Sequence, residues 1–220
     1  SVIFLPAQDV KAAAIEAIQA GLKLIVITTG NIPKRDMMLI RKEAVINKVI
    51  VLGGNSAGII TPGEALAGIM SDTAFKPGSI GIVSRSTSVM YYVVDTLVRS
   101  GYGVSSGIGL GGDPILGATF DEILWMFEKD HKTNAVMMIG EIGGRYEEQA
   151  IRTIKKMKTP VVAMVAGIYA PSGKVMGHAG AIVEGKIGGA REKHDALTSA
   201  GVNLARTFMD IPEILKKLGI

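Results

Sequence analysis

The sequence of 220 residues contains no cysteine. Disulfide bonds, thiolate metal sites and cysteine nucleophiles are therefore excluded, and an intracellular setting is compatible with this absence. No uncharged apolar stretch reaches the roughly 18 residues that a membrane helix needs. Residues 1–6 have neither a basic flank nor a cleavage pattern, so we expect no signal peptide and no membrane partner.

Positive charge is only slightly in excess. The formal net charge is +4 at pH 7, which suits anionic ligands such as phosphates. The lysine pairs at 155–156 and 216–217 fall on expected helix surfaces, and no aromatic residues interleave with them. Solvated helix faces explain these pairs better than nucleic-acid binding does.

Glycine and apolar residues are abundant, with 28 glycines and a hydrophobic fraction of 48%. This composition fits a compact α/β protein with many tight turns between strands and helices. Strand-like and helix-like segments alternate along nearly the whole chain, which is typical of a mostly parallel sheet with helices on its faces. We expect strands at 2–5, 22–27, 48–52, 79–83, 104–108, 135–139 and 160–165, and helices at 10–20, 35–47, 86–100, 119–129, 145–157 and 190–200.

Local signals mark several helix ends. Asp9 is placed to cap the first helix, and Gly21 is placed to end it in a left-handed conformation. Thr119 and Glu122 form a capping-box pattern at the start of another helix. Asp210 is expected to cap a short last helix.

The alternation is interrupted between residues 53 and 78. This interval carries the turn-forming runs GG, TPG and KPG and has little apolar periodicity. We therefore expect a domain boundary there, with a first domain of residues 1–76 and a second domain of residues 77–220.

One histidine stands out by its neighbours. His178 lies between Gly177 and Gly180, in a loop that follows an apolar run. Flanking glycines allow backbone N–H groups to approach an anion and leave the imidazole uncrowded, as a phosphorylated histidine requires. Glu141, in the run GEIGG, also follows an apolar strand and offers a carboxylate to orient the ring. A lone histidine is more often without chemistry, but the two signals together favour a functional site.

Ligands gather at the carboxyl ends of strands in such sheets, where the strand-to-helix turns cluster. The run SRSTS at 84–88 lies between a strand and a helix, so its amides and hydroxyls could bind phosphate at the helix N-terminus. Ordinary capping by Ser86 explains the run equally well. The run GLGGDP at 109–114 is by itself a signal for a tight turn only.

Several collinear runs resemble one enzyme family. The most specific are 108–127, 141–144 and 176–182, with shorter matches at 1–3, 32–33, 36–37, 60–64, 76–78, 83–86 and 170–171. Over essentially its whole length the chain is similar to the α subunit of succinyl-CoA synthetase. The wider family includes ATP-citrate lyase and other NDP-forming acyl-CoA ligases. The resemblance implies a partial Rossmann-like coenzyme-A-binding domain followed by a flavodoxin-like, parallel-sheet ligase domain.

The resemblance also implies roles for individual residues. His178 would be phosphorylated on Nε2, and Glu141 would bind and orient its ring. Tyr91 would match a tyrosine of the acid-substrate site. The remaining expected contacts are those to phosphate, from Ser86, Thr87, Ser88, Gly177 and Gly180, and those to coenzyme A, from Thr28, Thr29 and Gly30.

The family reaction couples an acyl-CoA and phosphate to ATP or GTP formation through an acyl phosphate and a phosphohistidine. The nucleotide, as ATP/ADP or GTP/GDP with Mg²⁺, would bind a partner β subunit in an αβ or α₂β₂ assembly. No Walker A loop occurs in this sequence, and we assign no metal ligand to this chain. The expected compartment is the cytoplasm, or the mitochondrial matrix in a eukaryote.

Two departures from the family keep alternatives open. The family's N-terminal portion, with its glycine-rich coenzyme A turn, has no counterpart here, so the chain is expected to lack that part of the coenzyme-A-binding domain. Thr87 replaces a family glycine in the phosphate turn. The alternatives are a ligase for another acid, such as malate or citrate, and a non-catalytic module that binds coenzyme A or an anion.

Three further expectations concern side chains outside the site. His131 is expected to help satisfy a helix C-terminus, and His194 is expected to be exposed on a helix rich in lysine and glutamate. The methionine pairs at 37–38 and 137–138 are expected to fill the core.

Overall fold

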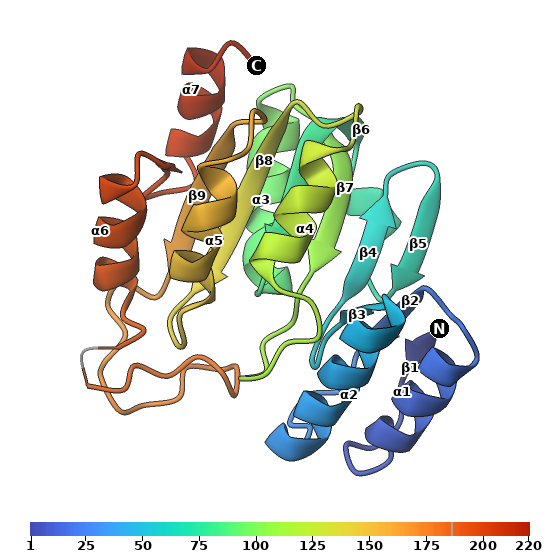
Figure 1. Cartoon of the computed structure of the whole chain (residues 1–220). Helices are drawn as coiled ribbons and strands as arrows, with labels where there is room; N and C mark the ends of the chain where they lie inside the picture. The colour runs from blue at the N-terminus through green and yellow to red at the C-terminus, as the bar shows by residue number, and fades with distance from the viewer. Residues whose placement is uncertain (186) are drawn as a thin grey trace.

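The computed structural model describes residues 1–185 and 187–220. Its strands form two sheets, one three-stranded with the order β1-β2-β3 and one seven-stranded with the order β10-β9-β8-β6-β7-β4-β5 (Figure 1). Within the described residues, no helix is both long enough and apolar enough to span a bilayer. The mixed α/β architecture with parallel-dominated sheets confirms the expected fold class.

The smaller sheet belongs to a βαβαβ unit at the N-terminus. It consists of β1 (Val2–Ile3), α1 (Val10–Gln19), β2 (Leu24–Ile27), α2 (Lys34–Asn47) and β3 (Ile50–Leu52), with all strand pairs parallel. The buried residues of the two helices recur at helical spacing and pack on one face of the sheet: Val10, Ala14, Ile18, Met37, Ile40 and Ala44. The opposite face, with Val26 and Leu52, joins the core of the larger unit.

The interval of turn-forming runs contains a hairpin that the sequence does not reveal. Strands β4 (Gly58–Thr61) and β5 (Ala65–Gly68) pair antiparallel, and β4 pairs antiparallel with β7 (Val104–Gly109). A short 3-10 helix follows at Asp72–Ala74. The hairpin thus extends the larger sheet, while the boundary at residues 76 and 77 stays a prediction.

The rest of the larger sheet is parallel. Strands β6 (Pro77–Ser84), β8 (Ala135–Glu141) and β9 (Val161–Ala166) join β7, and the two-residue strand β10 (Asn203–Leu204) lies at the edge. Every residue of β8 is buried, because helices cover both faces of the sheet. Such strands appear in the sequence as continuous apolar runs, which is why they were predictable.

Helices cover the two faces of the larger sheet in separate layers (Figure 1). Helices α4 (Phe120–Glu128), α5 (Tyr146–Ile154) and α6 (Ala190–Ser199) contribute to one apolar core. Helices α3 (Thr87–Arg99) and α7 (Asp210–Lys217) contribute to the other. The long loop between β9 and α6 runs below the carboxyl ends of the strands (Figure 1).

The helix ends follow the local signals with two exceptions. Gly21 has a φ of 79°, and Thr119 with Glu122 forms the capping box of α4. Asp9 precedes α1 but makes no side-chain cap hydrogen bond. Asp210 is not the cap of α7 either, because its carboxylate accepts from the N–H groups of residues 206 and 207 in the preceding turn.

Two expectations about burial are wrong. His194 is only 9% exposed, and its ring donates to the Val165 carbonyl at 3.3 Å, because α6 turns this face toward β9. Burial lowers the pKa of His194 below its ordinary value of 6.5. Met37 lies in the core, but Met38 is 60% exposed. His131 is exposed.

Asp113 joins the two units. Its carboxylate accepts hydrogen bonds from the N–H groups of Asn31 and Ile32 at 3.1 and 3.2 Å. Asp113 is 2% exposed. Gly54 passes so close that a Cβ there would lie 2.6 Å from Asp113 Oδ2. One buried carboxylate therefore ties the loop before α2 to the turn after β7.

We expect Asp113→Ala to lower the free energy of unfolding by about 1–3 kcal/mol, because a buried amide and a partly buried amide lose their acceptor. Urea unfolding measures the loss, and hydrogen exchange of the Asn31 and Ile32 amides should accelerate. Asp72→Ala, at an exposed position, serves as the control and should change neither quantity. Unaltered exchange of the two amides in Asp113→Ala would contradict the proposed tie.

Candidate active site

The predicted site forms where the parallel strands of the larger sheet end. Glu141 is the last residue of β8, and the turn after β6 carries Arg85. His178 lies in the loop between β9 and α6, which crosses under these strand ends (Figure 1). Segments that are far apart in the sequence thus meet at the carboxyl ends of the strands, as expected for a parallel sheet.

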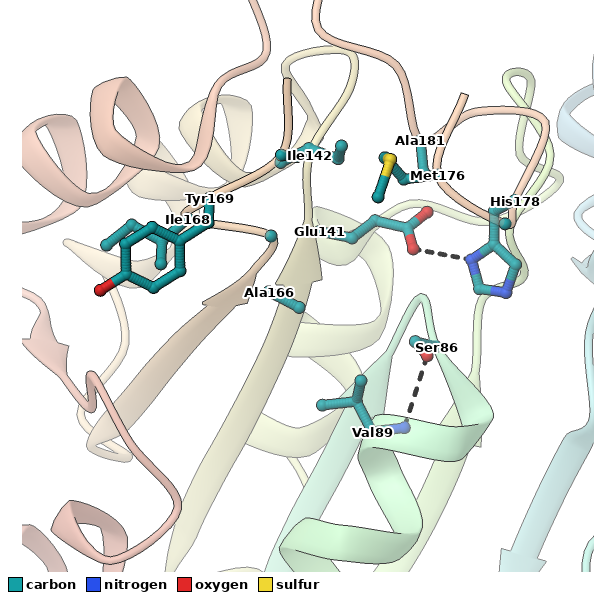
Figure 2. A pocket seen from close by; sticks show the side chains of 13 residues that line it. Ser86, Val89, Glu141, Ile142, Ala166, Ile168, Tyr169, Met176, His178 and Ala181 are labelled. Atoms are coloured by element: carbon teal, nitrogen blue, oxygen red, sulfur yellow. Dashed lines mark hydrogen bonds and ion pairs between the residues drawn. The ribbon is translucent and has the colours of Figure 1, made fainter. Parts of the chain in front are cut away.

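The Glu141 carboxylate is shared between a histidine and an arginine. One oxygen, Oε2, lies 2.7 Å from His178 Nδ1 (Figure 2). The other, Oε1, lies 3.2 Å from Arg85 Nη2. The side chains of Arg85 and Glu141 are 1% and 7% exposed, whereas that of His178 is 29% exposed. The chain Arg85–Glu141–His178 therefore runs from the interior to a reachable imidazole.

The guanidinium of Arg85 has partners on several sides. Its Nη2 donates to the Asp113 carbonyl at 3.1 Å and its Nε faces the Gly111 carbonyl at 3.4 Å. The cation also lies over the Tyr146 ring, 5.5 Å from the centroid. Glu141 Oε1 has no aligned hydrogen-bond donor among the described residues, so this opposite charge is what compensates its burial.

Glu141 determines the protonation chemistry of His178. The hydrogen bond to the carboxylate raises the pKa of His178 above its ordinary value of 6.5, although burial opposes the shift. When the ring is neutral, an Nδ1–H that donates to the carboxylate leaves the lone pair on Nε2. The arrangement therefore prepares Nε2 as a nucleophile.

Glycines shape the seat of the imidazole. A Cβ on Gly112 would lie 2.4 Å from the Cγ atom of His178, so the ring rests directly on this backbone. The Gly180 N–H donates to the Gly112 carbonyl at 2.9 Å, which fixes the histidine loop on the turn. Gly177 has a φ of 83° and faces open space on its Cβ side. Any side chain at Gly112 would displace the ring.

A cleft of about 520 Å³ opens beside His178. Figure 2 shows the imidazole beside Glu141, with Ser86 at the start of α3 below both. The lining is mostly apolar, and among the described residues that form it the only side chains of Asp, Glu, His, Lys or Arg are those of Glu141 and His178. The lining residues are Ser86, Val89, Glu141, Ile142, Ala166, Gly167, Ile168, Tyr169, Ala170, Met176, Gly177, His178 and Ala181.

The N-terminus of α3 borders this cleft. Ser86 is the N-cap, and its hydroxyl accepts from the Val89 N–H at 3.4 Å. Thr87 is half-buried and Ser88 is exposed. Within the described residues, the N–H groups of Thr87 and Ser88 have no hydrogen-bond acceptor, so they are free to bind an anion.

Other predicted residues lie apart from the cleft. The Tyr91 hydroxyl accepts from the Ser71 N–H at 2.8 Å, and its ring packs edge-on against Phe75. Thr28 and Thr29 follow β2, and their hydroxyls donate to carbonyls of residues 3 and 5. The predicted roles of Tyr91, Thr28, Thr29 and Gly30 stay predictions.

The structure adds residues that the sequence did not single out. Arg85 lies within the predicted phosphate turn, but its pairing with Glu141 depends on two strands meeting in space. Gly112 and Asp113 lie in a run that looked like a simple turn. Among the described residues, no cluster of three or more His, Asp and Glu side chains could hold a metal ion.

Comparison with protein families and curated sequences places the chain among known proteins. The family model of the CoA-ligases matches residues 65–203. Succinate–CoA ligase (ADP-forming) subunit alpha 1 of Archaeoglobus fulgidus is 44% identical over 99% of this chain and 75% of the relative. Succinate–CoA ligase (ADP-forming) subunit alpha of Methanothermobacter thermautotrophicus is 46% identical over 100% of this chain and 75% of the relative. The ADP-forming sulfoacetate-CoA ligase subunit SqwL of Acholeplasma sp is 42% identical over 100% of this chain and 76% of the relative.

Solved structures share the fold. The structure of ATP citrate lyase from Methanothrix soehngenii in complex with citrate and coenzyme A matches with a TM-score of 0.89 at 24% identity. The match covers 99% of this chain but 39% of that chain, and at this identity it supports the fold alone. A dinucleotide-forming acetyl-coenzyme A synthetase of Ca. Korarchaeum cryptofilum matches with a TM-score of 0.75 at 20% identity, over 94% of this chain and 45% of that one.

We expect NMR titration of the three histidines to place the pKa of His178 above 6.5, and Glu141→Gln to lower it. Because the folded-state pKa is raised, the charged pair stabilises the fold fully below pH 6.5. That contribution is lost as the pH rises through the folded-state pKa. His178→Asn assigns the signal. A His178 pKa that does not respond to Glu141→Gln would contradict the pairing.

Proposed function

This chain belongs to the CoA-ligase family, and from that premise we propose that His178 carries a phosphoryl group in the reaction of an NDP-forming acyl-CoA ligase. The protein is an α subunit of such a ligase, an enzyme that forms carbon–sulfur bonds. The proposal concerns how the reaction runs and with which substrates. Succinyl-CoA is the proposed acyl-CoA, because succinate–CoA ligase α subunits are similar to this chain over nearly its whole length.

The contact that carries the proposal is the 2.7 Å bond between His178 Nδ1 and Glu141. A carboxylate at Nδ1 fixes the tautomer in which Nε2 attacks, and it stabilises the positive charge that develops on the ring. The imidazole is partly exposed at the mouth of a cleft, whereas the carboxylate is buried. A histidine with a purely structural role would not need a reachable Nε2.

The proposed reaction runs in three reversible steps. A phosphate oxygen attacks the thioester carbon of the acyl-CoA, the carbon–sulfur bond breaks, and an acyl phosphate and free coenzyme A result. His178 Nε2 then attacks the phosphorus, and the carboxylate of the acid leaves. In the last step a nucleoside diphosphate oxygen takes the phosphoryl group, and the phosphorus–nitrogen bond breaks.

The first turn of α3 supports the phosphate in this scheme. The N–H groups of Thr87 and Ser88 have no acceptor within the described chain, and the helix dipole places partial positive charge at the same point. Ser86 and Gly177 line the cleft together with His178. Because phosphoryl transfer depends mainly on positioning and charge stabilisation, such backbone groups suit the task.

Coenzyme A and the nucleotide occupy different chains in the proposal. Coenzyme A would contact the loop formed by Thr28, Thr29 and Gly30 at the carboxyl end of β2, where ligands bind in parallel sheets. ATP/ADP or GTP/GDP, with Mg²⁺, would bind a β subunit in an αβ or α₂β₂ assembly. The name of an alpha subunit in the relatives supports a partner subunit.

A second candidate is the same chemistry on another acid. Thr87 adds a side chain to the helix turn beside the cleft, and that turn would face the acid in the proposed reaction. A relative similar over the full chain is named a sulfoacetate-CoA ligase subunit. A panel of succinate, malate, citrate and sulfoacetate, assayed with the partner subunit, ATP and coenzyme A, decides between them. We expect succinate to give the highest kcat/KM, and a clear preference for another acid would replace succinate in the proposal.

We expect the chain to take up an acid-labile, base-stable phosphate when incubated with its partner subunit and radiolabelled ATP with Mg²⁺. His178→Asn should abolish the label, and Glu141→Gln should slow labelling by roughly 10²–10⁴-fold. The rate should rise with pH through the His178 pKa, above 6.5, because the neutral ring is the nucleophile.

His131→Asn is the matched control, since His131 is exposed and precedes β8, whereas Glu141 lies at the opposite end of that strand, and it should label normally. Labelling that persists in His178→Asn would remove the assignment. Labelling that is unaffected by Glu141→Gln would leave the carboxylate without its proposed role.

A further inference from the structure

A wholly buried ion pair lies behind the candidate site. Lys193 of α6 and Glu147 of α5 are in direct contact through Nζ and Oε2, and both side chains are 0% exposed. A second carboxylate, that of Glu148, lies nearby with Oε2 at 4.0 Å from Nζ. The reaction proposed above uses none of these three side chains.

The pair holds the backbone on both sides of Ile142. Glu147 Oε1 accepts from the N–H of Glu141 at 3.1 Å. Lys193 Nζ donates to the carbonyl of Gly143 at 2.8 Å. Gly140 gives Glu147 its place, because a Cβ there would lie 2.5 Å from Glu147 Cγ. The two charged side chains therefore hydrogen-bond to the backbone on both sides of the short segment that carries the Glu141 carboxylate.

The sheet cannot hold this segment by itself. The β6–β8 ladder ends at the pair Ser84 and Ile139, since the chain of β6 turns into α3 after that point. On its other side Glu141 still pairs with β9, opposite Ala166. Gly143 has a φ of 94°, and its N–H donates to the Gly188 carbonyl at 2.7 Å, so the turn beyond β8 bonds to the loop before α6 rather than to the sheet. Glu147 supplies the acceptor for the Glu141 N–H that β6 no longer offers.

Stability alone does not explain such a pair. Desolvation of two buried charges offsets most of their attraction, so well-packed apolar residues of similar size usually stabilise a fold as well or better. A buried pair is worth keeping when it fixes a geometry. Here the fixed geometry is that of Glu141, whose bond to His178 depends on sub-ångström placement.

We propose that Glu147 and Lys193 are positioning residues, which hold the Glu141–Gly143 segment so that the Glu141 carboxylate meets His178 Nδ1. The inference rests on the proposed role of Glu141. Neither residue touches the reacting atoms. Both act through the backbone that carries the carboxylate, whereas Arg85 contacts the carboxylate itself at Oε1.

The test replaces both charges together, in Glu147→Leu/Lys193→Met, so that the net charge stays unchanged and neither member of the wholly buried pair is left without the other. We expect the double variant to fold, as judged by circular dichroism and thermal unfolding. The pKa of His178, measured by NMR, should fall toward 6.5 because Glu141 loses its register. Labelling of His178 should slow by roughly 10- to 100-fold.

A matched control removes an ion pair elsewhere. Lys11 and Asp36 pair at 2.8 Å between α1 and α2, and Lys11→Met/Asp36→Leu should leave the His178 pKa and the labelling rate unchanged. A merely structural loss in the first variant would change its melting temperature without moving the His178 pKa. An unchanged pKa in the folded Glu147→Leu/Lys193→Met protein overturns the proposal.

Gly140→Ala covers the case in which the double variant does not fold. Its Cβ pushes on Glu147 while both charges remain, so the His178 pKa should fall in the same direction by less. No change there also overturns the inference. The pKa readout needs neither partner nor substrate, so a fall in pKa without any labelling of the unmodified protein would retain the positioning role and refute the proposed function.

Discussion

The candidate site depends on a single carboxylate with two partners. Glu141 is buried, so it must be compensated, and it is compensated unevenly: a fixed guanidinium faces one oxygen and a titratable imidazole faces the other. An arginine guanidinium is not deprotonated in proteins, so the contact on that side of the carboxylate keeps its charge. When the charge of His178 changes, the contact between Glu141 and Arg85 stays the same. If His178 carries a phosphoryl group as proposed, Arg85 faces the same carboxylate before and after the transfer.

Much of the fold was predictable because its physics is local. The parallel strands appear as continuous apolar runs, and α3 and α4 begin at a serine cap and a capping box. The hairpin β4–β5 was missed because its short strands are framed by turn formers, and its strand character comes from pairing with β7. Strand β10, with two residues, exists through its contact with β9.

The site shows the same division. Glycine frames identified His178 and Glu141, since loops that approach a backbone closely need glycine on both sides. The partners of Glu141 could not be predicted in this way. Arg85 meets it only when β6 and β8 lie side by side, and the helix that carries Lys193 looked like a solvated surface. His194, next to it, was expected to be exposed for the same reason and is buried. A charged sequence does not reveal which of its charges are matched inside the protein.

The tie made by Asp113 has a consequence for how such proteins could be recombined. Its carboxylate binds two main-chain amides of the N-terminal unit, while its own carbonyl binds Arg85. Recognition of main-chain amides does not depend on side-chain identity. N-terminal units of different sequence could therefore dock onto the same larger unit and keep the hydrogen bonds to Asp113. What an exchanged unit must bring is a loop of matching shape, with a left-handed residue where Asn31 stands. At this junction, the shape of the backbone decides whether two units fit together, and the side-chain sequence does not.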